Sequence, residues 1–206
     1  MRYHCPLLPD HIYHVFNHAV GSENLFREAD NYSYFLELII RHIVPIADVY
    51  AYNLLPNHFH LLLRIKDVDG LTEYYQNQKN LPHPATIDWS RYVMQQFSNC
   101  CNAYAKAYNK RFDRRGALFL DYIKRSQITS QDYFFNCIHY IHFNAVHHGL
   151  CKSIDEWYWT SFQTYLTTAI TRLDRQVVLK NFDGKEQFIL FHQGKPKIFG
   201  DEFEFI

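Results

Sequence analysis

The order of apolar patterns along the chain predicts an α+β fold in which two helices cover an antiparallel sheet. Three observations support this prediction: short runs that alternate apolar and polar residues, two long runs with helical periodicity, and a Pro-Asn turn between two strand-like runs. The length of 206 residues suits one domain with an appendage, and a hydrophobic fraction of 48% excludes a disordered chain.

The first half of the chain predicts a strand, a helix and a hairpin. Ile12–His18 alternates and is rich in aromatic and β-branched residues, which is typical of a strand. Glu28–Ile43 has apolar residues at helical spacing and stops near Pro45, which indicates an amphipathic helix. Val49–Leu55 and His58–Lys66 flank the Pro-Asn turn and predict the two strands of the hairpin.

The middle of the chain completes the sheet. Asp67–Asp88 contains one Gly and two Pro and predicts a loop with at most a short helix. Trp89–Asn109 predicts a second long helix, and Ala117–Arg125 predicts a fourth strand. The order β-α-β-β-α-β is the ferredoxin-like, RRM-like split βαβ arrangement. Asp132 to about His148 predicts a third helix that a plain domain of this kind does not have.

Two histidines in the hairpin form the first candidate site. Side chains of a strand alternate between its faces, so an apolar set packs on the core and a second set faces away from it. The core set is Phe59, Leu61, Leu63 and Ile65, and the other set is His58, His60, Leu62 and Arg64. Two imidazoles on one face favour a metal site, because neutral imidazole is the commonest protein metal ligand. The alternative, two half-buried strand histidines without a ligand, stays open.

The third helix carries the second candidate site. Its apolar stripe, Phe134, Ile138, Ile141 and Ala145, is expected to dock on the domain, and a polar stripe contains Asn136, Tyr140, Asn144 and His147. Tyr140 and Asn144 lie one turn apart, so a hydroxyl stands beside an amide oxygen as a candidate nucleophile next to a candidate metal ligand. The alternative is a tyrosine that only packs its ring and leaves its hydroxyl in water.

Positive charge is concentrated in one segment, although the formal net charge is zero. Residues 104–150 carry seven Lys/Arg against three Asp/Glu, interleaved with aromatic residues. This mixture predicts contacts to phosphates and unpaired bases, while a solvated helix end is the alternative. The candidate nucleic-acid-binding residues are Lys106, Lys110, Arg111, Arg114, Arg115, Lys124 and Arg125.

Composition also indicates the compartment. Charged side chains interrupt every apolar run before about 18 residues, which excludes a spanning helix. The five cysteines are odd in number and lack CxxC spacing, and the first residues lack the layout of a signal peptide. We expect a soluble, cytoplasmic protein with buried free thiols and no membrane association.

Four motifs together resemble a known family. They are Tyr52-Asn-Leu-Leu-Pro-Asn-His-Phe-His-Leu-Leu62, Gly116-Ala-Leu-Phe119, Tyr140-Ile-His-Phe-Asn144 with His148-Gly149, and Trp157-Tyr-Trp-Thr-Ser161. In combination they are similar to the single-tyrosine HUH transposases of the IS200-like group, and within it to the REP-associated tyrosine transposases. The match covers roughly residues 10 to 165, so the resemblance implies a catalytic domain over 1–165 and a C-terminal appendage or tail over 166–206.

The resemblance implies a mechanism. His58 and His60 would be metal ligands for Mg²⁺ or Mn²⁺, Asn144 the third ligand, and Tyr140 the nucleophile. The protein would cleave and rejoin single-stranded DNA, recognised with a hairpin, through a 5′-phosphotyrosine intermediate, as a monomer or homodimer. Many relatives have Pro where this chain has Ala145, so the third helix is expected to run on to Gly149.

Two other functions remain open at this stage. One is a nucleic-acid-binding module on an RRM-like fold that catalyses nothing, and the other is a metal-dependent phosphodiesterase that uses water as its nucleophile. The first predicts unligated histidines and aromatic side chains displayed on the sheet. The second predicts catalysis that does not depend on Tyr140.

Overall fold

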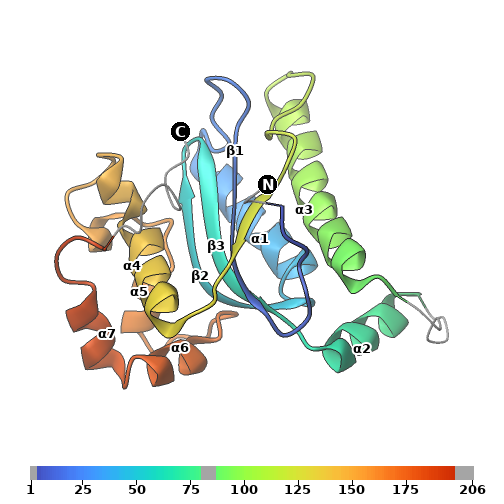
Figure 1. Ribbon diagram of the computed structural model, residues 1–206. Coiled ribbons are helices and arrows are strands. Elements are labelled where there is room, and N and C mark those ends of the chain that lie inside the picture. The colour runs from blue at the N-terminus through green and yellow to red at the C-terminus, as the bar shows by residue number, and fades with distance from the viewer. Residues whose placement is uncertain (1–3, 80–86, 198–206) are drawn as a thin grey trace.

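A computed structural model describes residues 4–79 and 87–197 of the chain. Its centre is one antiparallel sheet with strand order β2-β3-β1-β4 (Figure 1). The strands are β1 Ile12–His18, β2 Ala47–Leu55, β3 His58–Ile65 and β4 Lys124–Gln127. The first strand and the hairpin are therefore confirmed. The hairpin places β3 between β2 and β1, so β3 lies inside the sheet.

Two helices cover one face of the sheet, as predicted. They are α1, Ala29–His42, and α3, Trp89–Arg111. The predicted core set of β3 lies on this face, in one apolar cluster with Phe35 of α1 and Phe97 of α3. Burial of these side chains supplies the main free energy that holds the helices on the sheet.

The opposite face is covered by α4, Gln131–His147, and by the short helices that follow (Figure 1). After a 3₁₀ turn at Ile154–Glu156 these are α5 Phe162–Leu166, α6 Arg175–Asn181 and α7 Lys185–Phe191. The predicted stripe of α4 is buried: three of its residues share a second apolar cluster with Leu62 of β3 and with side chains of all three short helices. The helix continues past Ala145, as expected, and Gly149 follows its end with φ +69°.

The prediction of a loop over Asp67–Asp88 is wrong in its first half. Residues Val68–Lys79 form α2, a helix of 12 residues, and residues 80–86 lie outside the described part of the chain. The helix begins because the Asp67 carboxylate accepts a hydrogen bond from the backbone N–H of Gly70, at 2.9 Å. Leu71 is fully buried and anchors the helix to the main core. The glycine that suggested a loop lies in the capped first turn.

The fourth strand begins later than predicted. The segment after Gly116 makes one isolated bridge, Ala19 to Phe119, and then leaves the ladder until β4 begins at Lys124. Leu118 and Ile123 are buried in the main core, so the apolar residues of this stretch belong to a buried connecting segment. The residues of β4 are all polar and half-buried, which leaves no apolar pattern to read.

Five cysteines are free thiols, of which three are buried and two are half-buried. Among the described residues, none of the helices has the length and apolar character needed to cross a membrane.

Candidate active site

His58 is held at both of its ring nitrogens. It begins β3, immediately after the turn, on the face of the strand that α4 covers. Its Nδ1 lies 2.7 Å from Oδ1 of Asn57, and its Nε2 lies 3.0 Å from Oδ1 of Asn144 on α4. Two motifs that stand 86 residues apart in the sequence therefore meet through these side chains.

His60 is held on the same face by a neighbouring strand. Its Nδ1 lies 2.8 Å from Nε2 of His14 on β1. The ring of Tyr140 stands nearly perpendicular to the His60 ring, with centroids 5.6 Å apart. Since His14 occupies Nδ1, Nε2 is the nitrogen of His60 that remains to bind a ligand.

Tyr140 and Asn144 reach this cluster from α4. Tyr140 is only 3% exposed, and Asn144 is fully buried. The Tyr140 ring also contacts His14, at a centroid distance of 6.2 Å. Because residues i and i+4 share a helix face, both side chains lie on the face of α4 that meets the histidines. The structure thus brings together all four residues that the sequence assigned to metal binding and catalysis.

The sequence analysis assigned no role in the site to three further histidines of this cluster. His18 stacks on His58 with ring centroids 4.4 Å apart, and His148, the C-cap of α4, meets His58 edge-on at 5.0 Å. The third is His14. Alternation along β1 already put His14 and His18 on one face. The cross-strand register, in which His18 lies opposite His58, was the missing information.

Burial keeps the imidazoles neutral. Loss of water around the ring lowers the pKa of His14 and of His58 to about 3 and that of His18 to about 4. Burial likewise lowers the pKa of His60 well below its usual range. At neutral pH each ring therefore offers one nitrogen lone pair, which is the form that binds a metal ion.

The atoms around Asn144 fit a divalent cation. Both ring nitrogens of His58 face amide oxygens, Oδ1 of Asn57 and Oδ1 of Asn144, and a neutral ring has a proton for only one of them. In the tautomer in which Nδ1 donates to Asn57, the Nε2 lone pair faces Oδ1 of Asn144, a second acceptor. The Nδ2 group of Asn144 is buried and has no hydrogen-bond partner among the described residues. A cation bound by both acceptors would offset their mutual repulsion.

The donor set is unusual in composition. Within residues 4–79 and 87–197, no group of three or more His, Cys, Asp or Glu side chains is placed to hold a metal ion. The candidate set is instead two imidazole nitrogens and one amide oxygen. Oxygen ligands suit Mg²⁺ and Mn²⁺, and three protein ligands leave coordination positions for a substrate.

Most of the basic segment lies across the sheet from this cluster, because α3 packs on the opposite face from α4. Lys106, Lys110, Arg111 and Arg115 are exposed there. Arg111 makes ion pairs with Glu28 and, at 3.7 Å, with Asp30. Lys124 lies beside the histidine cluster: its Nζ is 5.9 Å from the ring of Phe16 on β1, and that ring stacks on His60.

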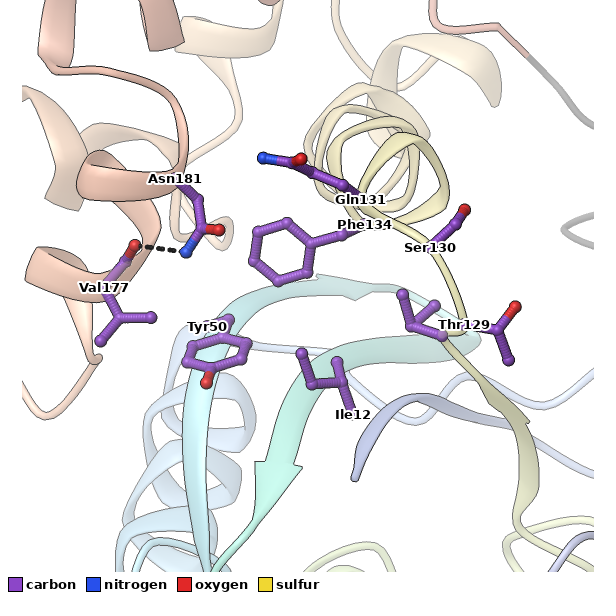
Figure 2. A pocket seen from close by; sticks show the side chains of 9 residues that line it. Ile12, Tyr50, Thr129, Ser130, Gln131, Phe134, Val177 and Asn181 are labelled. Carbon is purple, nitrogen blue, oxygen red and sulfur yellow. Dashed lines mark hydrogen bonds between the residues drawn. The ribbon is translucent and has the colours of Figure 1, made fainter. Parts of the chain in front are cut away.

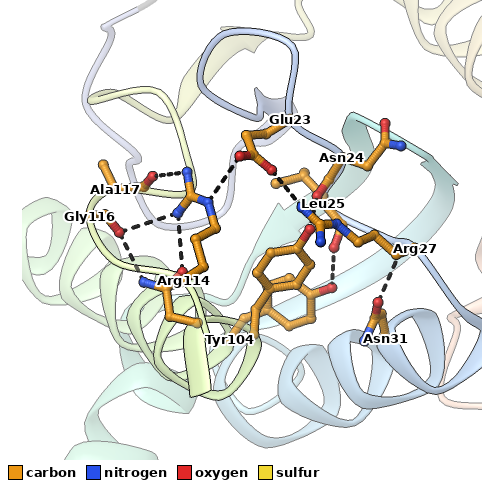
Figure 3. A network of polar contacts seen from close by, with 11 residues as sticks. Glu23, Asn24, Leu25, Arg27, Asn31, Tyr104, Arg114, Gly116 and Ala117 are labelled. Atoms are coloured by element: carbon orange, nitrogen blue, oxygen red, sulfur yellow. Dashed lines mark hydrogen bonds and ion pairs between the residues drawn. The ribbon is translucent and has the colours of Figure 1, made fainter. Parts of the chain in front are cut away.

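Two of the seven candidate residues support the fold. Arg114 pairs with Glu23 at 3.2 Å and donates to the backbone oxygens of Gly116 and Ala117 (Figure 3). Arg125 donates to the Cys5 carbonyl at 2.7 Å. The aromatic residues between the cations are also engaged: Tyr104 and Tyr108 are buried and donate their hydroxyls to backbone oxygens of the β1–α1 loop. They do not form a surface for stacking bases.

A cavity of about 420 Å³ lies at the other end of α4, beside its N-terminus (Figure 2). Its apolar side is formed by Ile12, Tyr50 and Phe134, and the amides of Gln131 and Asn181 stand nearby. None of the candidate site residues lines it. The candidate active site is therefore identified by its donor geometry, separately from this cavity.

Comparison with known proteins agrees with the fold. No family model and no curated protein sequence matches this chain. Among solved structures, the chain is similar to a REP-associated tyrosine transposase bound to a REP hairpin, with a TM-score of 0.55. The similarity covers 84% of this chain and 94% of that chain at 15% sequence identity. A likeness at this level of identity establishes a shared α+β fold.

Proposed function

We propose that this protein is a DNA-binding transposase that cleaves and rejoins single-stranded DNA through a 5′-phosphotyrosine link at Tyr140. The observation that carries the proposal is the meeting of His58 with Asn144 and of His60 with Tyr140. We take the α+β fold to be ferredoxin-like, with α4 as the added helix that carries the nucleophile. Residues 1–165 would form the catalytic domain and residues 166–206 the appendage.

His58, His60 and Asn144 would hold one Mg²⁺ or Mn²⁺ ion. When bound, the ion supplies Lewis acidity, which polarises a phosphate oxygen and offsets the charge that develops there. The chain's contribution is preorganisation: His14 and Asn57 fix the ring orientations of His60 and His58, and burial keeps both rings neutral.

The tyrosine supplies the covalent step. Its phenolic oxygen attacks the phosphorus atom, the bond between phosphorus and the 3′-oxygen breaks, and that oxygen takes up a proton to become a 3′-hydroxyl. The phenolic proton goes to water. Tyr140 stays linked to the 5′-phosphate, so the energy of the phosphodiester is conserved. Attack by another 3′-hydroxyl reverses the step and rejoins DNA without ATP.

Single-stranded DNA with a hairpin is the proposed partner. The similar solved transposase is bound to a REP hairpin, and Lys124 places a cation beside the histidine cluster of this chain. A phosphate near Lys124 would be attracted to the positive charge and lose counterions on binding.

One observation weighs against a binding module without catalysis. Such a module stacks bases on aromatic side chains displayed by its sheet. Here Phe16, the aromatic residue of β1 beside the histidines, is only 1% exposed. A phosphodiesterase that uses water differs from the transposase because it forms no covalent link between Tyr140 and DNA.

The test is identification of the covalent adduct. The protein is incubated with Mn²⁺ and a pool of random-sequence single-stranded oligonucleotides labelled at the 3′ end, and then denatured. A transposase carries label through denaturing electrophoresis, and mass spectrometry of the digested adduct places the nucleotide on Tyr140. Cleavage without an adduct would support the phosphodiesterase, and an adduct on Tyr133 would move the nucleophile.

A further inference from the structure

The motif Trp157–Ser161 is a strap along the edge of the sheet. Strand β2 is the edge strand, and the backbone of the strap pairs with it: Leu54 N–H donates to Trp159 at 2.9 Å, and Ser161 N–H donates to Tyr52 at 3.0 Å. The Trp157 indole donates to the Leu54 carbonyl at 3.0 Å. This pairing satisfies edge groups of β2 and fixes Ser161 beside α4.

Ser161 is one end of a buried hydrogen-bond chain whose direction is determined. At the other end, Nδ1 of His192, the C-cap of α7, donates to the Phe188 carbonyl at 2.7 Å, because a carbonyl can only accept. Both rings are buried, which favours the neutral form of an imidazole, and burial lowers the pKa of His192 to about 3. Nε2 of His192 therefore accepts from Nδ1 of His142, at 2.9 Å.

The next two hydrogen bonds lead from α4 to the sheet. Nε2 of His142 then carries a lone pair and accepts from the Ser161 hydroxyl at 2.8 Å. The Ser161 oxygen in turn accepts from the backbone N–H of Tyr52 on β2, at 2.9 Å. The Ser161 hydroxyl also lies 3.2 Å from the Tyr52 carbonyl, so its longer contact leads to the same strand, and His142 and Ser161 are both fully buried. The chain thus connects α7, α4, the strap and β2 without an unsatisfied member.

Asn53 forms a second connection between β2 and α4. It is fully buried, and its Nδ2 donates to the backbone oxygen of Ile141 at 2.6 Å. On its other side it lies directly opposite His60 in the β2–β3 register. Ile141 and His142 are the two residues that follow Tyr140. The bond from Asn53 and the hydrogen-bond chain through His142 therefore both hold α4 next to the proposed nucleophile.

We propose that Asn53, His142 and Ser161 are positioning residues that fix the rotation of α4 about its axis. The inference rests on the proposed function of Tyr140. His142 lies about 200° around the helix from Tyr140, so the helix is held on one side by the chain and presents Tyr140 and Asn144 on the other. Side-chain tips stand about 6 Å from a helix axis, so a rotation of about 10° moves them by about 1 Å. A shift of that size at a reacting atom costs about 100-fold in rate.

The test compares two substitutions of one residue in the full chain. His142→Phe keeps a planar ring but removes both polar ends, whereas His142→Gln keeps one donor and one acceptor. We expect His142→Phe to slow adduct formation at saturating oligonucleotide at least tenfold, with DNA affinity changed less than about twofold. His142→Gln should recover most of the rate. A folded His142→Phe protein with the parental rate would overturn the proposal.

Two further measurements keep the test decisive. If His142→Phe does not fold, Ser161→Ala removes the hydroxyl at little change in volume, with Ser161→Thr as the variant that retains it, and the same rate criterion applies. If the parent forms no adduct with the oligonucleotide pool, the proposed function fails, and hydrogen exchange decides this inference separately. Faster exchange of α4 amides in His142→Phe than in His142→Gln supports positioning, and equal exchange overturns it.

Discussion

Nε2 of His58 and Oδ1 of Asn144 lie 3.0 Å apart across the contact between β3 and α4. Two ligands at right angles about an octahedral ion with bonds of about 2.1 Å are separated by about 3.0 Å. The spacing of these two acceptors therefore matches adjacent positions around one Mg²⁺ or Mn²⁺ ion. The amide of Asn144 is thus placed as a ligand although it lies 86 residues from His58 in the sequence.

This relationship predicts opposite effects of two substitutions at one position. Asn144→Leu removes the oxygen and should lower Mn²⁺ affinity at least about tenfold, because one of three protein ligands is lost. Asn144→Asp supplies a carboxylate, which binds hard cations more strongly, and should keep or raise the affinity. Calorimetric titration with Mn²⁺ measures both. His18→Phe, which retains a ring stacked on His58, is the control and should bind Mn²⁺ as the parent does. Parental affinity in Asn144→Leu would remove Asn144 from the site.

Arg114 and Arg115 are neighbours with different predicted roles. Arg114 is 16% exposed and ties the segment after α3 to Glu23 (Figure 3), whereas Arg115 is exposed. Arg114→Ala should lower the free energy of unfolding by about 1–3 kcal/mol, because several hydrogen bonds of one charged donor are lost together. Arg115→Ala should change it by less than about 0.5 kcal/mol. Urea unfolding of the two variants measures the difference.

Arg115 is also predicted to contribute to DNA binding. If Arg115 contacts one phosphate, Arg115→Ala should reduce the slope of log affinity against log salt by about 0.7 for a single strand. The loss should be similar for all sequences, because a phosphate contact carries no base information. An unchanged slope would place the DNA away from the end of α3, toward Lys124 and the histidines.

Stability should depend on pH through His192. Burial lowers its pKa in the folded protein to about 3, while an unfolded histidine titrates near pH 6.5. Below pH 6.5 the unfolded chain therefore binds a proton that the folded chain does not, and stability is lost as pH falls from about 6.5 toward 3. Each such histidine contributes a slope that reaches about 1.4 kcal/mol per pH unit in the middle of this window.

A substitution isolates that contribution. His192→Gln should be less stable than the parent at pH 8, where the buried chain of hydrogen bonds is intact in the parent. Between about pH 5.5 and 4.5 its stability should fall less steeply, by about 1.4 kcal/mol per pH unit. Urea unfolding at several pH values measures both slopes. Equal slopes would mean that His192 takes up its proton in the folded state.

The sequence predicted the parts of the fold and site that depend on local periodicity. Alternation along His58–Ile65 correctly assigned every side chain of β3 to a face, because a strand has a period of two. Helical spacing identified the buried stripe of α4 for the same reason. Both predictions needed only residues that lie within a few positions of one another in the sequence.

The features that the sequence did not yield depend on contacts between distant segments. His14 and His18 were visible as one face of β1, but only the register with β3 makes them neighbours of His60 and His58. Tyr104 and Tyr108 stand one turn apart, which fits a buried stripe of α3 as well as a surface for bases. Tyr104 and Tyr108 belong to the buried stripe, because they pack against the β1–α1 loop and both hydroxyls donate to backbone oxygens of that loop.

Tyr140→Phe separates the transposase from both alternatives, because it keeps the ring but removes the oxygen that would form the covalent link. The Tyr140 ring packs against His60 and His14, and the phenylalanine ring retains this packing, so the fold and the Mn²⁺ affinity should be nearly unchanged. A transposase would lose strand cleavage and the adduct while still binding single-stranded DNA. A phosphodiesterase that uses water would continue to cleave, and a binding module would cleave neither before nor after the change.

Cleavage and adduct formation are read on one denaturing gel with Mn²⁺ and the labelled oligonucleotide pool, with Tyr133→Phe as the matched control on the same helix. Cleavage by Tyr140→Phe, or its loss in Tyr133→Phe alone, would contradict the assignment of Tyr140 as the nucleophile.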